Sequence, residues 1–291
     1  MIELFSLLTE PFAYEYMLKA MALSSLVGGV CALLSAYLML KGWSLIGDAL
    51  SHAVVPGVAI AYALGLPFAV GAFFSGILAA LSILWVKSLT QLKEDAVIGF
   101  IFTAFFALGL FIISISPTPV NVQEIIFGNI LGISDGDMIQ VGIVMGMALI
   151  FLLIFWKDLL VVFFDEIHAR SVGLSPKVYQ VLFFILLSAC VVSALQTVGA
   201  ILVIAMVITP GATAYQLTDR FASMLLIAGF LGVMTGGVGV YLSYYLDGAT
   251  GGIIVCLQTL AFILAFLFSP KFGIITERLK RKKAQQSAIH A

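Results

Sequence analysis

Asp48 and His52 are the two residues of this sequence whose types and spacing best fit metal chemistry. They lie four positions apart in the stretch GWSLIGDALSHAVVPG. On an α-helix this spacing projects both side chains from one face, one turn apart, so a carboxylate and an imidazole can meet at one point. An oxygen and a nitrogen ligand together suit manganese, iron(II) or zinc, whereas calcium prefers oxygen ligands alone. The pair therefore predicts a site for a divalent transition metal.

Pro56 and Gly57 follow the pair directly. Pro56 has no N–H to donate to the carbonyl of His52, so the helix is weakened beside the predicted ligands. We therefore predict that Pro56 and Gly57 form a hinge on the path that the metal ion would take. The alternative is that Asp48 and His52 pair with each other, or with a neighbouring helix, and only specify packing. Two ligands do not complete a coordination shell, but a symmetric dimer would supply two aspartates and two histidines.

The segments that must position this pair have the composition of a membrane protein. Of the 291 residues, 62% are hydrophobic and 10% are charged, whereas a soluble domain has about 25% charged residues. We predict an all-α polytopic membrane protein, a single domain over residues 1–291 with about nine transmembrane helices. The predicted spans are 17–40, 44–65, 67–87, 95–115, 137–156, 178–198, 200–217, 221–246 and 251–268. The stretch 116–134, broken by glycines, is predicted to form a short interfacial or re-entrant helix.

Lysine and arginine fix the predicted orientation, because they concentrate in cytoplasmic loops. With nine spans and an external N-terminus, thirteen of the fourteen basic residues fall on the cytoplasmic side, and Lys19 is the exception. The basic tail at about 270–291 would then face the cytoplasm, where anionic lipid can hold it. The sequence therefore predicts a multi-pass protein of a bacterial cytoplasmic (inner) membrane with its C-terminus inside.

A cytoplasmic loop at about 157–177 contains the second informative stretch, FFDEIHARSVGLSP. Residues from Asp165 to about Val172 favour a short amphipathic helix that Gly173 ends. The spacing of Glu166, Ala169 and Gly173 resembles the loop by which importer permeases dock on their ATPase subunits. A solvated connector is the alternative interpretation.

Pro210 and Gly211 repeat the proline–glycine pattern inside the seventh predicted span. Pro210 leaves the carbonyl of Met206 without its helical donor. The pair can therefore act as a hinge that faces the pathway, or as a kink that fits helix packing.

Several absences restrict the function. The sequence contains no G-x-x-x-x-G-K-[ST] motif, so ATP-driven transport would need a separate ATPase chain, and it contains no HExxH motif of a metalloprotease. The three cysteines are odd in number and lie far apart in apolar runs, which argues against a disulfide framework. We therefore expect a non-enzymatic protein without a permanently bound cofactor, whose metal is its substrate.

Three stretches together carry a family resemblance that covers nearly the whole chain. They are Gly47-Asp48-Ala49 with Ser51 to Gly57, Asp165-Glu166 with Ala169 and Gly173, and Thr209-Pro210 with Ala212 to Ala214. They resemble the permease subunits of bacterial ABC importers for manganese, zinc and chelated iron. The resemblance implies a fold similar to that of vitamin B12-type (type II) permeases.

The resemblance also assigns roles and partners. Asp48 and His52 would contact the metal, and the helix from about Asp165 to Gly173 would couple to the ATPase. Expected partners are two cytoplasmic ATPase subunits, an extracellular or periplasmic metal-binding protein, membrane lipid, and a second permease that is either a copy or a sister subunit; nucleic acid is not expected. Pro56-Gly57 is more typical of manganese and iron members, and zinc stays open.

Two other classes of function remain as alternatives. A secondary metal transporter or channel would need no ATPase, but the spans hold no further carboxylates for a proton relay. A siderophore-type permease would have a wide path without metal ligands, which fits Asp48 and His52 poorly.

Overall fold

The computed structural model describes residues 9–115, 132–269, 271, 273 and 276, and the regular elements in this part of the chain are all helices. They are η1 (Glu10–Ala13), α2 (Glu15–Lys41), α3 (Ile46–Ala53), α4 (Val55–Ala63), α5 (Phe68–Leu89), α6 (Glu94–Ile115), α8 (Asp135–Phe164), α9 (Glu166–Ser171), α10 (Pro176–Val198), α11 (Ala200–Leu217), α12 (Phe221–Leu246) and α13 (Thr250–Phe268). The interfacial helix expected in 116–134 and the basic tail expected from 270 fall almost entirely outside the described residues.

The predicted all-α membrane fold is confirmed. Each predicted span is helical, and eight helical segments of the described residues are long and apolar enough to cross a membrane. The seventh predicted span differs, because the apolar helix Leu202–Leu217 is shorter than the others. The second predicted span is not one regular helix: it consists of α3 and α4, which meet at Val54.

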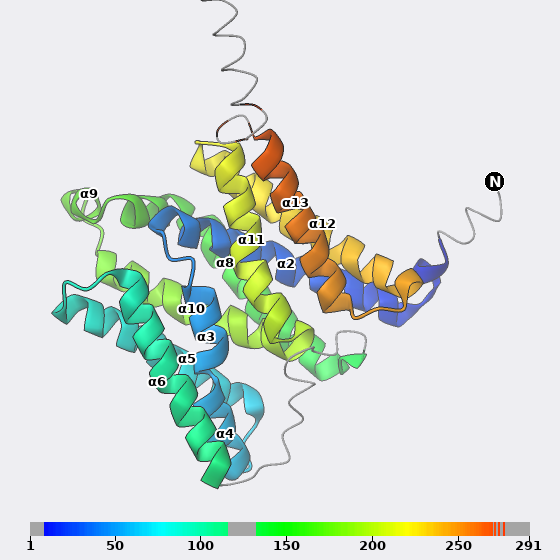
Figure 1. Ribbon diagram of the computed structural model, residues 1–291, viewed down its shortest axis with the longest axis horizontal. Coiled ribbons are helices and arrows are strands. Elements are labelled where there is room, and N and C mark those ends of the chain that lie inside the picture. Colours follow the sequence, from blue (N-terminus) through cyan, green and yellow to red (C-terminus); the bar gives the residue numbers. More distant parts are fainter. Residues whose placement is uncertain (1–8, 116–131, 270, 272, 274–275, 277–291) are drawn as a thin grey trace, which may run out of the picture.

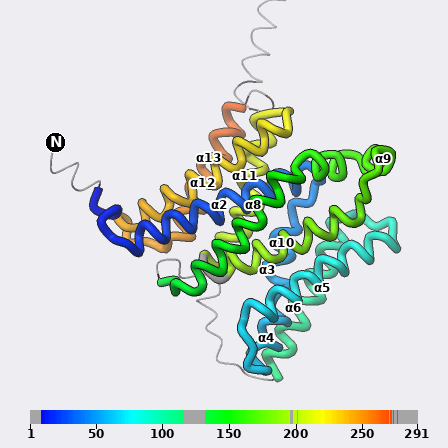
Figure 2. Tube along the Cα trace, turned by 180° about the vertical axis from the view of Figure 1, so that it is seen from behind, coloured from blue at the N-terminus to red at the C-terminus, as the bar shows by residue number. Residues whose placement is uncertain are grey.

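The helices form two groups joined by a third (Figures 1 and 2). α2 packs against α11 and α12, and α13 packs on α11 and α12, whereas α3, α4, α5 and α6 pack among themselves. α8 and α10 connect the groups, since α8 contacts α2 and α10 contacts α5, and α3 also contacts α11 directly. α9 lies at one end of the molecule with the C-terminal end of α2, and the turn between α4 and α5 lies at the other end.

Small residues let α2 and α12 approach closely. A Cβ atom at Gly28 would lie 2.4 Å from the carbonyl oxygen of Gly232, and a Cβ atom at Gly232 would lie 2.2 Å from the carbonyl oxygen of Gly28. Such backbone contact is typical of membrane helices, where lipid tails are as apolar as leucine and close packing replaces the hydrophobic effect. The contact fixes α2 against α12.

Aromatic side chains fill the interior near the α9 end. Trp43 stacks on Phe184 with ring centres 5.2 Å apart and meets the edge of Phe163 at 5.5 Å. Phe163 lies 4.7 Å from Phe183, and Tyr37 packs against both. All five side chains are buried, so they join α2, α8, α10 and the turn before α3 in one rigid core.

Candidate functional site

Asp48 and His52 lie together on α3, as the spacing predicts. Nε2 of His52 is 3.4 Å from Oδ1 of Asp48, and the two side chains are 36% and 40% exposed, respectively. Both ligand types are therefore accessible at one place. Among the described residues no three His, Cys, Asp or Glu side chains gather closely enough to hold a metal ion, so further ligands would have to come from elsewhere.

The helix that carries the pair ends immediately after it. The N–H of Val54 donates to the carbonyl of His52, and Oγ of Ser75 donates to the carbonyl of Ala53 at 2.7 Å. The break precedes Pro56 by two residues, and Pro56 takes one of the first positions of α4, where its missing N–H costs no helical hydrogen bond. Because an unpaired carbonyl in a membrane costs several kcal/mol, the hydroxyl on α5 stabilises the broken backbone.

Two phenylalanines of α6 enclose the imidazole. The ring of His52 lies 5.5 Å from that of Phe102 and 5.6 Å from that of Phe106. On the other side α3 approaches α11, where a Cβ atom at Gly47 would lie 2.8 Å from Cγ1 of Val207. α3 is thus fixed between α6 and α11. The sequence gives no signal for the two phenylalanines, because apolar residues occur all along α6.

Gly57 lies at a close contact between helices. A Cβ atom there would be 2.0 Å from the carbonyl oxygen of Gly71, and a Cβ atom at Gly71 would be 2.1 Å from the carbonyl oxygen of Gly57. The nitrogen of Pro56 faces α6, because a Cβ atom at Gly109 would lie 2.9 Å from it. The residues predicted to form a hinge therefore pack directly on α5 and α6, and their role as a hinge stays a prediction.

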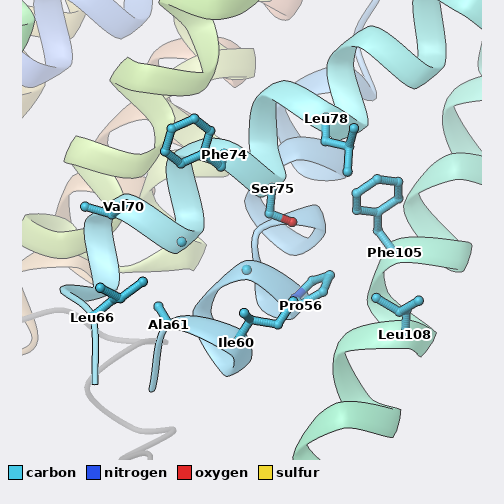
Figure 3. Close-up of a pocket in the computed structure, with 12 residues that line it drawn as sticks. Pro56, Ile60, Ala61, Leu66, Val70, Phe74, Ser75, Leu78, Phe105 and Leu108 are labelled. Carbon is cyan, nitrogen blue, oxygen red and sulfur yellow. The ribbon is translucent and has the colours of Figure 1, made fainter. Parts of the chain in front are cut away.

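An apolar pocket of about 390 Å³ lies beside this contact, between α4, α5 and α6 (Figure 3). Its lining includes Pro56, Phe74, Leu78 and Phe105, and Ser75 contributes a hydroxyl group. That hydroxyl is already bonded to a backbone carbonyl, and Phe74 and Leu78 are 65% and 59% exposed. The pocket has no carboxylate or imidazole to hold a cation, and its outer side chains would meet lipid.

Pro210 and Gly211 lie inside α11, which continues through them. The N–H of Gly211 donates to Oγ of Ser35 at 3.1 Å, and the same hydroxyl donates to the carbonyl of Ile208 at 3.0 Å. A Cβ atom at Gly211 would be 2.4 Å from Oγ of Ser35. The structure thus gives these residues a packing contact with α2, and their role as a pathway hinge stays a prediction.

The predicted cytoplasmic helix is α9, and Asp165 caps it. The carboxylate of Asp165 accepts from the N–H groups of His168 and Ile167 at 3.0 and 2.8 Å, which holds its pKa below the ordinary value. Ala169 is fully buried. Gly173 ends the helix with φ +84°, a left-handed conformation that glycine adopts without strain.

Glu166 points into the protein. Its Oε1 lies 2.8 Å from Nζ of Lys41 and accepts from Nε2 of Gln180 at 3.0 Å. Burial alone would raise the pKa of Glu166, but the hydrogen bond and charge of Lys41, helped by Gln180, outweigh it and lower the pKa. The carboxylate is therefore ionised at neutral pH and bound within the chain, and its predicted role in ATPase coupling stays a prediction.

Three large apolar side chains are exposed on α9 and its flanks, beside the exposed polar residues Asp165, His168 and Arg170. Phe164, Ile167 and Val172 are 77%, 82% and 55% exposed. Their exposure in a region predicted to lie in the cytoplasm is typical of a surface that another protein covers.

Comparison with known proteins gives consistent matches over nearly the whole chain. The model of the ABC 3 transport family matches residues 13–269. The "Probable iron transport system membrane protein" of Haemophilus influenzae is 72% identical, over 94% of this chain and 97% of its own. The manganese transport system membrane protein MntB of Synechocystis is 49% identical, over 94% and 90%. Among solved structures, PsaBC from Streptococcus pneumoniae in complex with Fab superposes with a TM-score of 0.80, 35% identity, and coverage of 97% of this chain and 100% of that chain.

Proposed function

Because this chain belongs to the ABC 3 transport family, we propose that it carries iron(II) or manganese(II) into the bacterial cytoplasm as the permease subunit of an ATP-binding-cassette importer. The observation that carries the proposal is the Asp48–His52 pair, which is accessible on α3 beside a break in the helix. Inserting a charged residue at the centre of a membrane helix costs about 2.5 to 3.5 kcal/mol. Such residues are therefore rare, and they usually line the path of a substrate or an ion. In this proposal the pair binds the metal transiently.

The choice of metal rests on ligand chemistry and on the relatives. Imidazole is a common ligand of iron and carboxylate of manganese, and the relatives are named for iron and for manganese transport. Zinc serves as the comparison metal in the test below. Passage requires weak binding, so high affinity for the metal belongs to the extracellular binding protein.

Two parts of the chain, the Asp48–His52 pair and the exposed residues around α9, indicate the partners. A second permease, either a copy or a sister subunit, would bring another set of ligands to the Asp48–His52 pair, because the described residues of one copy offer too few for a complete shell. A separate ATPase subunit would cover the apolar face of Phe164, Ile167 and Val172. In this proposal the protein spans the inner membrane, with its N-terminus outside and α9 on the cytoplasmic side.

The test is uptake of radioactive manganese(II), iron(II) and zinc(II) by cells that express the complete transport system. We expect Asp48→Asn and His52→Ala to lower uptake of the transported metal by at least about tenfold, since each removes a ligand. Asp95→Asn, the same change at an exposed position at the start of α6, should leave uptake unchanged. Membrane abundance of every variant is measured in parallel.

The outcomes separate the functions. Loss in both variants at normal abundance supports the pathway role, and the most affected metal identifies the substrate. Undiminished uptake in both variants would make Asp48 and His52 packing residues. Uptake by the wild type without any ATPase would instead indicate a gradient-driven transporter.

A further inference from the structure

Six polar or aromatic side chains meet where α9 approaches the turn that leads into α3. We call this group the Trp43 junction; it consists of Lys41, Trp43, Lys87, Glu94, Glu166 and Gln180. Its members come from the ends of α2, α5, α6, α9 and α10 and from the α2–α3 turn. Neither the metal pair nor the exposed face of α9 includes any of them.

Trp43 is the centre of the junction. It is 2% exposed, its indole N–H donates to Glu94, and the ammonium groups of Lys87 and Lys41 lie 5.0 and 5.8 Å from its ring centre. Lys87 also pairs with Glu94. Cations over the face of a tryptophan ring are attracted by its electron density. The ring of Trp43 therefore stabilises the positions of both lysines, and its N–H binds Glu94 at the start of α6.

Lys41 and Glu166 connect this centre to α9. The side chain of Lys41 is 17% exposed and that of Glu166 is 34% exposed, and their charged atoms are 2.8 Å apart. Lys41 is the last residue of α2, Gly42 ends the helix in a left-handed conformation with φ +78°, and Trp43 follows directly. The ion pair therefore joins α9 to the segment that continues into α3.

α9 itself has the features of a short movable piece. Its six residues make less than two turns, which is too short for stability without partners. Asp165 before it is extended, and Gly173 after it is left-handed, so the chain bends at both ends. A displacement of α9 can therefore reach the segment before α3 through the Lys41–Glu166 pair, in addition to the contacts of α9 with α8 and α10.

We propose that the Trp43 junction transmits displacement of α9 to α3, with Lys41 and Glu166 as positioning residues that couple ATP turnover to metal passage. The inference rests on the proposed function. The path is short: Lys41 and Trp43 lie within seven residues of Asp48, and the ring of Trp43 is fixed in the aromatic core. Glu166 thus acts inside the permease, and the ATPase meets other residues of α9.

The test uses the complete transporter, with its binding protein and ATPase, reconstituted in vesicles. Manganese(II) uptake and ATP hydrolysis are measured in the same sample, and their ratio is the readout. We expect Lys41→Ala and the nearly isosteric Glu166→Gln to lower manganese transported per ATP by about fivefold or more, while ATP hydrolysis stays within about twofold. Lys41→Arg should retain coupling, because it keeps the charge.

A double-mutant cycle separates coupling from general damage. If the two residues act through one ion pair, Lys41→Ala with Glu166→Gln should be no worse than the more damaging single change. Lys177→Ala is the control, an exposed lysine at the start of α10 for which the described residues show no ion pair. Co-purification of the ATPase checks assembly.

Three results would overturn the inference alone: an unchanged ratio in both single variants, equal loss of uptake and ATP hydrolysis, or single effects that multiply in the double variant. A wild-type transporter that takes up neither manganese(II) nor iron(II) would overturn the proposed function, and this inference with it.

Discussion

At the residue scale, the surroundings of Asp48 and His52 restrict how the pair can meet a metal. Phe102 and Phe106 hold the imidazole of His52 from the α6 side, while its Nε2 faces Asp48. A ligand held in this way loses little rotamer freedom when a metal arrives. The arrangement supports transient binding by a prepared pair.

Asp165 provides a residue-scale prediction on α9. Asp165→Ala should increase hydrogen exchange at the amides of Ile167 and His168, because their acceptor is lost. Asp165→Asn should keep most of the protection, since asparagine also caps helices. Hydrogen exchange followed by mass spectrometry measures both, and equal exchange in the wild type and the alanine variant would contradict the capping role.

The same contact predicts a pH dependence. The pKa of Asp165 is lowered in the folded state, so the stabilisation is present above the ordinary carboxyl pKa of about 3.9 and is lost as pH falls through the lower folded value. Wild-type protection of α9, corrected for intrinsic exchange, should be constant from neutral pH to about 5 and decline below about 4. The asparagine variant should lose the part of this decline that Asp165 causes, and the part that remains belongs to Glu166, whose pKa is also lowered by Lys41.

The spacing of Asp48 and His52 allowed their proximity to be predicted, because four positions within one helix determine it. The ion pair of Lys41 and Glu166 could not be predicted, since these residues are 125 positions apart. Their contact depends on where α9 folds back, which no local pattern specifies. The sequence pattern therefore predicted a role in ATPase coupling for Glu166 but not its partner within the chain.

At the element scale, backbone contacts between glycines determine how α4 meets α5. Gly57→Ala should lower the free energy of unfolding by about 1 to 3 kcal/mol, because the new Cβ atom would overlap the carbonyl of Gly71 and the helices would have to separate. Gly99→Ala on α6 is the matched control, because a Cβ atom there has no neighbour within 4 Å. Thermal unfolding of the purified protein in detergent compares them, and similar losses in both would refute the packing role.

The elements were predicted well because each apolar run is long and bounded by charges or turns. The break at Val54 was foreseen only as a weakening near Pro56. Its stabilisation by Ser75 could not be foreseen, because a serine in a membrane helix more often bonds within its own helix, as Ser82 does to the carbonyl of Leu78. Pro210 shows the converse, since it leaves α11 continuous.

At the scale of the whole molecule, charge asymmetry supports the proposed orientation. Basic residues gather at the end that carries α9 and the C-terminal ends of α2 and α5, whereas Asp135 and Asp137 begin α8 at the opposite end. Positive charge stays in the cytoplasm during insertion. The proposed orientation follows from this distribution.

Single cysteines test the orientation in a variant whose native cysteines, Cys31, Cys190 and Cys256, are replaced by alanine. A cysteine at Gly136 should react with a membrane-impermeant maleimide in intact spheroplasts, because Gly136 would lie outside. A cysteine at Lys177 should react only after permeabilisation. The reverse pattern would invert the topology, and labelling of the cysteine-free variant measures background.

The exposed apolar face of Phe164, Ile167 and Val172 has a consequence for the cell's handling of the protein. A permease made in excess of its ATPase would leave this face in water, where chaperones and proteases recognise exposed hydrophobic segments. Orphan copies would then be removed, so the amount of permease that accumulates would follow the amount of its partner. In the proposed complex, removal of surplus copies would match the amount of permease to its partner through three exposed side chains on α9 and its flanks.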